Sequence, residues 1–218
     1  MARLSRERVL EAAVALADEA GLDGLSMRRL ATELGVVPMA LYKHVANKDE
    51  LLDGIIDTVV SEIDLGTTPG AGEGDWKPAV RGRILAARQT LLRHPWAAGA
   101  IESRRVPTPA VMAYMDSVIG VFRAGGFGVD LVHHVIHALG SRILGFSQEL
   151  FYDTPTDPDA QEKAAHAMAG TFPWLAEMAL RVAHDEKTVV GSGCDDQFEF
   201  EFALDLLLDG FERLRQAG

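Results

Sequence analysis

Hydrophobic side chains recur along this chain at the three- and four-residue spacing of an α-helix, and strand-like alternation is rare. The first helix is expected to begin after Ser5, a favourable N-cap, and to end at Gly21. Its apolar face consists of Val9, Leu10, Ala13, Leu16, Ala17 and Ala20. The pattern predicts an all-α fold.

A short second helix, a turn and a short third helix are predicted next. Ser26 is a suitable cap for the second helix, and Gly35 suits the turn because a positive φ costs little only for glycine. Pro38 fits the first turn of the third helix, where its missing N–H is not needed. Two short helices joined by such a turn are typical of a helix-turn-helix, whose second helix enters the DNA major groove.

An Asn-x-x-Glu capping-box pattern opens a fourth helix over residues 48–64, and the Gly-rich residues 66–74 are expected to form a linker. We therefore expect a helix-turn-helix DNA-binding domain over residues 1–50, connected by the fourth helix to a larger helical domain over residues 75–218. Further helices are expected near residues 76–94, 97–104, 108–125, 128–153, 159–170, 173–186 and 195–216.

The net charge of −11 argues against a general polyanion-binding protein, but the charge is unevenly distributed. Residues 24–48 carry four basic side chains and one acidic one, whereas residues 51–218 carry 14 basic and 24 acidic side chains. A basic head on an acidic body suits a protein that touches phosphates at one end only, with chance clustering of surface charge as the alternative.

Candidate DNA contacts come from the predicted third helix and its surroundings. Leu41 is expected to pack inward and to leave its neighbours on the outer side, where side chains can reach base edges and phosphates. Arg28 lies near the start of the second helix, whose N-terminus offers oriented donors to a phosphate. The predicted DNA-binding residues are Ser26, Arg28, Val37, Pro38, Met39, Ala40, Tyr42, Lys43, His44 and Lys48.

Three blocks of sequence around these residues resemble the tetracycline-repressor (TetR) family of bacterial regulators. The blocks are Ser26-Met27-Arg28-Arg29-Leu30-Ala31, Leu34-Gly35-Val36 and Leu41-Tyr42-Lys43-His44-Val45-Ala46-Asn47-Lys48-Asp49-Glu50-Leu51-Leu52. The resemblance is strong over residues 5–60 and looser beyond. The start of the third helix departs from the tetracycline repressor, because Val37, Pro38 and Met39 replace a start that is richer in hydrogen-bonding side chains. Apolar contacts to thymine methyl groups are then expected.

The last predicted helix has more apolar residues than one face requires. One stripe is expected to pack within its own subunit: Phe200, Ala203 or Leu204, Leu207, Phe211 and Leu214. A second set is left over: Phe198, Phe202, Leu206 and Leu208. Two apolar faces need two partners, although burial wholly within one subunit is the alternative.

The family resemblance implies a homodimer in which this helix and the helix at 128–153 meet their copies as a four-helix bundle. Such a two-fold arrangement suits a palindromic operator with two half-sites. The predicted dimer contacts are Gly140, Leu144, Phe198, Phe202 and Leu206, with the glycines Gly140 and Gly145 allowing close helix approach.

A regulator also needs an effector site, and surplus methionine and aromatic side chains suit an adaptable apolar pocket. The candidate effector-binding residues are Trp96, Met112, Met115, Phe122, His137, Phe146, Met168, Phe172 and Trp174. Each could equally be an ordinary core residue. The pocket is expected between the helices at 76–94, 108–125 and 128–153. Asp64 stands where the tetracycline repressor has a drug-contacting histidine, so tetracycline is not expected as the effector.

His133, His134 and His137 form the one cluster that suggests other chemistry. His133 and His137 share a helical face at a spacing that can bind zinc or nickel, but no His-Glu-x-x-His pattern or nearby cysteine completes a site. No phosphate loop, dinucleotide fingerprint or serine elbow occurs, so neither an enzyme nor a cofactor is expected. The single cysteine, Cys194, excludes an intrachain disulfide and favours a reducing compartment.

The sequence therefore predicts a ligand-responsive transcriptional repressor that binds double-stranded operator DNA as a homodimer and is released by a small, mostly apolar effector. The absence of a signal peptide or an apolar run of membrane-spanning length favours the cytoplasm, with no membrane partner. A metal-binding or enzymatic helical protein that uses the histidine cluster is the main alternative, and an activator with the same DNA-binding head is another.

Overall fold

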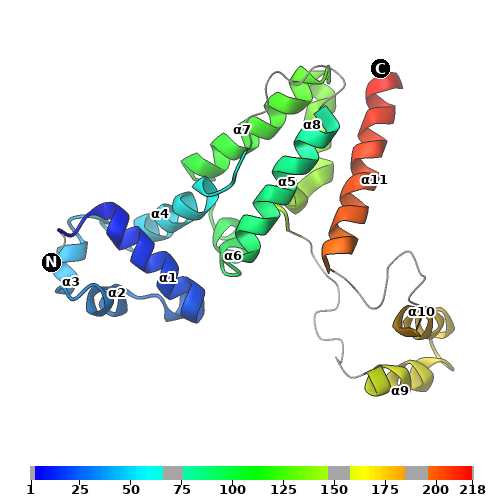
Figure 1. Ribbon diagram of the computed structural model, residues 1–218, viewed down its shortest axis with the longest axis horizontal. Coiled ribbons are helices and arrows are strands. Elements are labelled where there is room, and N and C mark those ends of the chain that lie inside the picture. Colours follow the sequence, from blue (N-terminus) through cyan, green and yellow to red (C-terminus); the bar gives the residue numbers. More distant parts are fainter. Residues whose placement is uncertain (1–2, 66–75, 147–157, 185–195, 218) are drawn as a thin grey trace. The chain divides into compact units, whose positions relative to one another are not determined.

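A computed structural model describes residues 3–65, 76–146, 158–184 and 196–217. These residues form helices only, without a strand, so the all-α prediction is confirmed for the described chain (Figure 1). The chain divides into two compact units, Met1–Phe146 and Ser147–Gly218, which are described separately. The predicted linker at 66–74 lies outside the described residues.

The first unit begins with a head of three helices, which a fourth helix joins to the rest. These are α1 (Arg6–Gly24), α2 (Met27–Glu33), α3 (Pro38–Leu41) and α4 (Lys48–Ser61). Ser5 caps α1 by accepting a hydrogen bond from the Arg8 amide at 3.3 Å. Gly21, with φ of 67°, interrupts regular helix geometry where we expected α1 to end, but the helix is assigned on to Gly24.

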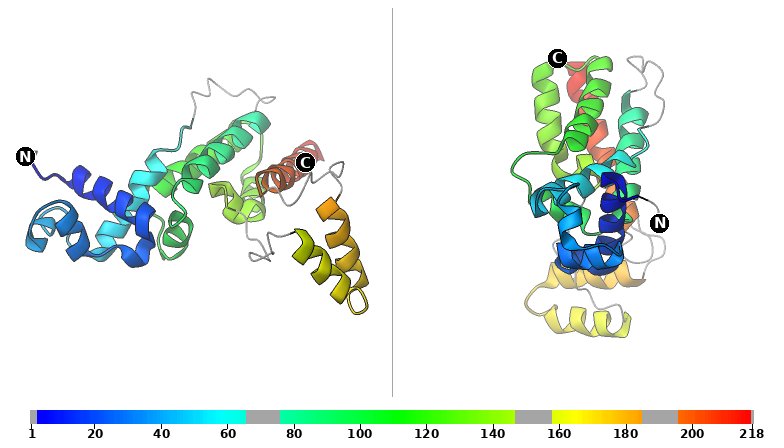
Figure 2. Two further views of the ribbon diagram at one scale, coloured as in Figure 1. Left: turned by 60° about the horizontal axis from the view of Figure 1, so that its bottom comes forward. Right: turned by 90° about the vertical axis from the view of Figure 1, so that its left-hand side faces the viewer.

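Helix α4 lies between α1 of the head and the remaining helices of the first unit (Figures 1 and 2). Its packing against α1 is close at Gly54, where an added Cβ would lie 2.6 Å from Leu10 Cδ2. Leu51, Ile55 and Val59 of the same helix are also buried. One helix therefore belongs to the cores of both the head and the body.

The body of the first unit is built from five further elements. They are α5 (Trp76–Leu92), α6 (Ala97–Glu102), α7 (Pro109–Ala124), α8 (Val129–Leu139) and the 3-10 helix η1 (Gly140–Leu144). An aromatic cluster fixes one end of this body: the rings of Trp76, Phe122 and Phe127 lie 4.7–5.4 Å apart, the first of them from α5 and the second from α7. Such ring pairs add to the stabilisation from burial alone.

The expected single helix over 128–153 is wrong. Helix α8 ends at Leu139 because Gly140 adopts φ of +51°, and the chain continues as η1 to Gly145, with φ of +80°. A Cβ at Gly145 would lie 2.4 Å from Arg88 Cα, so this glycine does permit close approach, but to α5 of its own subunit. The remainder of the expected helix, from 147 on, lies outside the described residues.

The second unit contains α9 (Pro158–Met168), α10 (Pro173–His184) and α11 (Asp196–Ala217). Helices α9 and α10 pack against each other as a hairpin, in which Ala165 and Ala176 are buried. Helix α11 buries a stripe at helical spacing, consisting of Phe200, Leu204, Leu208 and Phe211. This corrects the expected stripe: Leu208 is buried, Leu207 is half-buried, and Leu214 is 56% exposed.

Candidate DNA-binding surface and its connection to the body

The helix-turn-helix is held together by local contacts that its sequence encodes. The Ser26 side chain accepts a hydrogen bond from the Arg29 amide at 3.2 Å and so caps α2. Gly35 turns the chain with φ of +65°, and Pro38 occupies the first turn of α3. Leu41 is fully buried and anchors α3 to the head. These four expectations are confirmed.

The outer side of α3 is exposed and largely apolar at its start. Val37 is 68% exposed, Met39 71% and Tyr42 44%. Pro38 and Lys43 are also exposed, whereas Ala40 and His44 are half-buried. The single turn of α3 and its flanking residues therefore present a surface that can enter a groove, in which apolar side chains come first along the chain and polar ones follow.

Basic and polar groups surround this surface. Ser26, Arg28 and Lys48 are exposed, and Lys48 begins α4 directly after its cap. Arg29, in contrast, pairs with Glu19 of α1 at 2.9 Å. The two adjacent arginines thus have different surroundings: Arg28 stands in solvent, and Arg29 ties α2 to α1.

The capping box at the start of α4 is formed. Asn47 Oδ1 accepts a hydrogen bond from the Glu50 amide at 2.8 Å, and Glu50 Oε2 accepts one from the Ala46 amide at 2.6 Å. Glu50 thus reaches one residue further back than the usual box. Arg6 of α1 lies 3.7 Å from Glu50, so the starts of α1 and α4 are close together.

Helix α4 is bound to the body through an acidic stripe that sequence reasoning missed. The Arg104 guanidinium donates to Asp49 at 3.1 Å and contacts Asp53 at 2.7 Å. The hydrogen bond to Asp49 and the charges of both carboxylates raise the pKa of Arg104, although partial desolvation opposes them. Asp57 accepts a hydrogen bond from the Ala110 amide at 3.0 Å in the first turn of α7. The available signal was the four-residue spacing of the three aspartates, which places them on one face.

A second connection joins α1 directly to the segment between α5 and α6. Asp18 Oδ1 accepts from Trp96 Nε1 at 2.7 Å and lies 2.7 Å from His94 Nδ1. His94 Nε2 faces Glu62 at the end of α4 at 3.4 Å, and Arg93 donates to the same Glu62 oxygen at 3.1 Å. Trp96, which we predicted as an effector contact, is therefore bound to the head.

The other predicted effector residues occupy different surroundings. Phe122 is fully buried in the aromatic cluster with Trp76 and Phe127. In the first unit, Met112 and His137 are exposed, and Met115 and Phe146 are half-buried. In the second unit, Met168 is half-buried, Phe172 is 56% exposed and Trp174 is 80% exposed. Their role in effector binding stays a prediction.

Buried polar groups that we did not predict lie in the body. The Tyr114 hydroxyl donates to the Ile143 carbonyl at 2.6 Å, and burial raises the pKa of this phenol. Arg88 is 2% exposed and donates to the Gly145 carbonyl at 2.9 Å. Both contacts hold η1 to the neighbouring helices α5 and α7.

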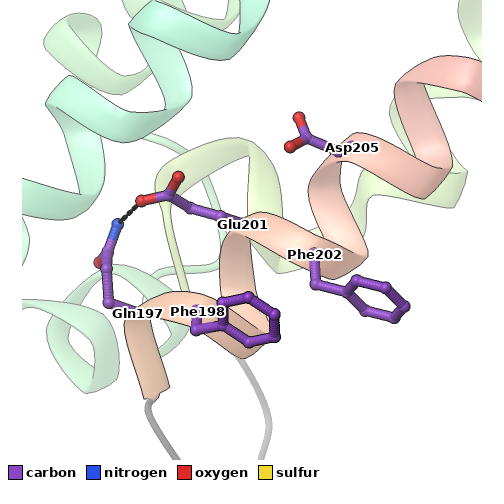
Figure 3. Close-up of a pocket in the computed structure, with 5 residues that line it drawn as sticks. All are labelled: Gln197, Phe198, Glu201, Phe202 and Asp205. Atoms are coloured by element: carbon purple, nitrogen blue, oxygen red, sulfur yellow. Dashed lines mark hydrogen bonds between the residues drawn. The ribbon is translucent and has the colours of Figure 1, made fainter. Parts of the chain in front are cut away.

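The predicted dimer residues of α11 lie on an exposed face. Figure 3 shows Phe198 and Phe202 on this face, and their rings are stacked with centroids 6.2 Å apart. Together with Gln197, Glu201 and Asp205 they line a shallow pocket along α11. Phe198, Phe202 and Leu206 are 38%, 45% and 55% exposed, whereas Leu144 is buried and Gly140 lies exposed at the break after α8. The assignment of these five residues as dimer contacts stays a prediction.

The histidine cluster lies on α8 with its side chains exposed. The His133 ring is 4.6 Å from the His137 ring and 5.5 Å from the His134 ring. Within the described part of the chain, no group of three or more His, Cys, Asp or Glu side chains is arranged to hold a metal ion.

The fold and the surface define the class of protein. An exposed helix-turn-helix that one helix joins to a helical body is the architecture of a one-component DNA-binding regulator. Residues 9–55 match the family model of bacterial regulatory proteins of the tetR family, and residues 68–215 match that of the tetracyclin repressor-like C-terminal domain. The chain belongs to the TetR family. The family match makes it a transcriptional regulator.

Individual relatives agree with this assignment. The chain is 32% identical to the HTH-type transcriptional repressor DrrR1 of Streptomyces coeruleorubidus over 97% of its length and 78% of the relative's. It is 28% identical to the class C tetracycline repressor protein of Escherichia coli, over 99% of this chain and 94% of that protein. Among solved structures, apo ActR of Streptomyces coelicolor matches with a TM-score of 0.79 at 28% identity, over 100% of this chain and 99% of that one.

No helix among the described residues combines the length and apolar character that crossing a membrane requires.

Proposed function

We propose that this protein represses transcription as a homodimer on a palindromic operator, with one half-site for each head, and that a small, mostly apolar effector releases it. The observation that carries the proposal is the exposed start of α3. Val37 and Met39 are apolar, yet their side chains are 68% and 71% exposed. Exposed apolar side chains on a groove-sized helix need a partner, and thymine methyl groups supply one.

Polar groups around α3 would position the head on the DNA backbone. Tyr42, Lys43 and His44 follow the apolar front, and Arg28 and Lys48 flank it from α2 and α4. Contacts of this kind fix register and supply salt-dependent affinity, whereas Val37, Pro38, Met39 and Ala40 would contribute direct readout. The Ser26 hydroxyl already caps α2, so its part is to orient that helix end toward a phosphate.

The exposed face of α11 supports the homodimer. Phe198, Phe202 and Leu206 recur every four residues on that face, as expected of a helix that meets a second helix. Replacing Phe202 with Glu should shift the protein to monomers in analytical ultracentrifugation. Leu92→Glu, at an exposed leucine of α5, is the matched control and should leave the dimer intact.

Effector binding is proposed for the body. Regulation by a small molecule is supported by the likeness to ActR, whose structures include complexes with actinorhodin and (S)-DNPA at 28% identity to this chain. The predicted pocket residues with exposed or half-buried side chains in the first unit are Met112, Met115, Phe146 and His137. Calorimetric titration with apolar candidate effectors tests this part.

We further propose that the protein acts in the cytoplasm, where DNA is available to it.

The decisive experiment measures binding of the protein to the DNA upstream of its own coding sequence by fluorescence anisotropy. Lys43→Ala and Tyr42→Phe should weaken binding while leaving the unfolding temperature unchanged. Lys163→Ala, which removes an exposed lysine of α9, is the control and should bind like the unchanged protein. Equal binding by Lys43→Ala and the control would contradict the assignment of α3 as the DNA-reading helix.

A further inference from the structure

His94 occupies a position between the head and the body that neither DNA contact nor effector binding explains. Its side chain is only 9% exposed, and its two ring nitrogens face carboxylates from two different elements. Nδ1 lies 2.7 Å from Asp18 of α1, and Nε2 lies 3.4 Å from Glu62, the C-cap residue of α4. The imidazole thus bridges the head and the connecting helix.

The contacts of Asp18 fix which nitrogen carries the proton in a neutral ring. An ionised carboxylate only accepts hydrogen bonds, so Nδ1 must donate to Asp18, as Trp96 Nε1 does to the same oxygen at 2.7 Å. A neutral imidazole with its proton on Nδ1 has a lone pair on Nε2. That lone pair would face the Glu62 carboxylate, and protonation of Nε2 converts this repulsive approach into a charge-assisted contact.

The charges around the ring favour the same outcome. The groups that face it are Asp18 from α1, Glu62 from the end of α4, and Arg93, which shares Glu62 at 3.1 Å; Trp96 lies against the ring edge at 6.1 Å between centroids. Two carboxylates and one permanent cation leave one negative charge, which an imidazolium balances. Partial exposure of Glu62, at 41%, moderates the effect through solvent screening.

We propose that His94 is a proton-dependent latch between the DNA-binding head and the body. The doubly protonated ring donates to both Asp18 and Glu62 and holds α1 and the end of α4 to the segment between α5 and α6. The neutral ring keeps only the Asp18 contact. The head is therefore held more firmly when the ring carries its second proton.

The test compares thermal unfolding of the full chain at about pH 5.5 and about pH 8. His94→Asn keeps a side-chain donor near the position of Nδ1 but removes the titrating group, and Glu62→Gln removes the second carboxylate. When the pH rises from about 5.5 to about 8, the unfolding temperature of the unchanged protein should fall by about 2–4 °C more than that of either variant. A difference of this size is expected when a chain of this length loses one such contact. His166→Asn, which removes an exposed histidine paired with Glu162 on α9, is the matched control and should keep the full pH dependence.

A second readout does not depend on overall stability. Nitrogen-15 spectra of histidine-labelled protein, with the His94 signal assigned by its loss in His94→Asn, should show a proton on Nδ1 throughout and the gain of one on Nε2 as the pH falls. Equal pH dependence of unfolding in the unchanged protein and in His94→Asn would overturn the latch, as would a His94 ring whose proton resides on Nε2 in the neutral form.

The consequence for DNA binding rests on the proposed function. If the head position controls operator affinity, binding to the upstream DNA should vary with pH more in the unchanged protein than in His94→Asn. Absence of any binding to that DNA by the unchanged protein at either pH would contradict the proposed function and leave the unfolding and spectroscopic tests of the latch in force.

Discussion

Helices α3 and α4 follow each other in the chain but are stabilised in different ways. Helix α3 has four residues, no side-chain hydrogen bond at its cap, and one buried residue, Leu41. Helix α4 has 14 residues, a cap formed by Asn47, and six buried residues. The surface that we propose reads DNA is therefore a thin exposed layer, and its position depends on the buried helices beneath it.

This difference separates specificity from stability. Exposed residues of α3 can change with little effect on folding, because substitutions away from packed sites usually alter stability by less than about 0.5 kcal/mol. Residues of α4 face the head on one side and the body on the other, through Gly54 against Leu10 and Asp57 against Ala110. A change there should affect both stability and the position of the head.

The largest effect on the free energy of unfolding is expected at Leu41, the residue that anchors α3. Leu41→Ala removes the one fully buried side chain of α3 and should lower the free energy of unfolding by about 2–5 kcal/mol, through lost burial and the cavity that remains. Urea denaturation measures the change. Val37→Ala, at an exposed neighbour in the same segment, should leave the midpoint unchanged; equal effects of the two substitutions would show that α3 is not anchored as described.

The next effect concerns affinity alone. Arg28→Ala removes an exposed guanidinium beside the proposed recognition surface. If Arg28 contacts a base, operator binding should weaken by about 1–3 kcal/mol. If it contacts a phosphate, the number of counterions released on binding, read from the salt dependence of affinity, should fall by about one. Fluorescence anisotropy at several salt concentrations distinguishes the two. A loss of affinity that is accompanied by an equal loss of thermal stability would mean that Arg28 supports the fold instead.

Sequence reasoning predicted the head accurately because its signals are local. The Ser26 cap, the Gly35 turn, Pro38 in the first turn of α3 and the Asn47 cap all follow from contacts within four residues along the chain. Periodicity also predicted that Leu41 is buried. Each of these features depends on backbone geometry that a few neighbouring residues determine.

The body was harder to predict because its decisive contacts are distant in sequence. Trp96 looked like a pocket residue, but it donates to Asp18, which lies 78 positions away. The helix expected through residue 153 ends at Leu139, since Gly140 tolerates the positive φ that places Gly145 against Arg88. Nothing in a helical pattern shows whether a glycine inside it continues the helix or ends it.

A moderate effect is expected at the cap of α4. Asn47→Ala removes the acceptor for the Glu50 amide and should lower the free energy of unfolding by about 1 kcal/mol. Asn47→Asp keeps an acceptor at the same position and should be nearly neutral. Urea denaturation of the two variants compares them directly, and equal destabilisation would show that the amide hydrogens of Asn47, and not its acceptor, hold the helix end.

The smallest effect tests the charged side of α4. Arg104 bridges Asp49 and Asp53, but their side chains are 78% and 42% exposed, so solvent screening limits the stabilisation. Arg104→Gln should lower the free energy of unfolding by about 0.2–1 kcal/mol at low salt, and the difference should shrink at about 1 M salt, where charges are screened within about 3 Å. Denaturation at the two salt concentrations measures it. A large loss that is independent of salt would show that Arg104 acts through packing of its aliphatic stem, and that α4 is attached to the body by the same kind of contact that anchors α3.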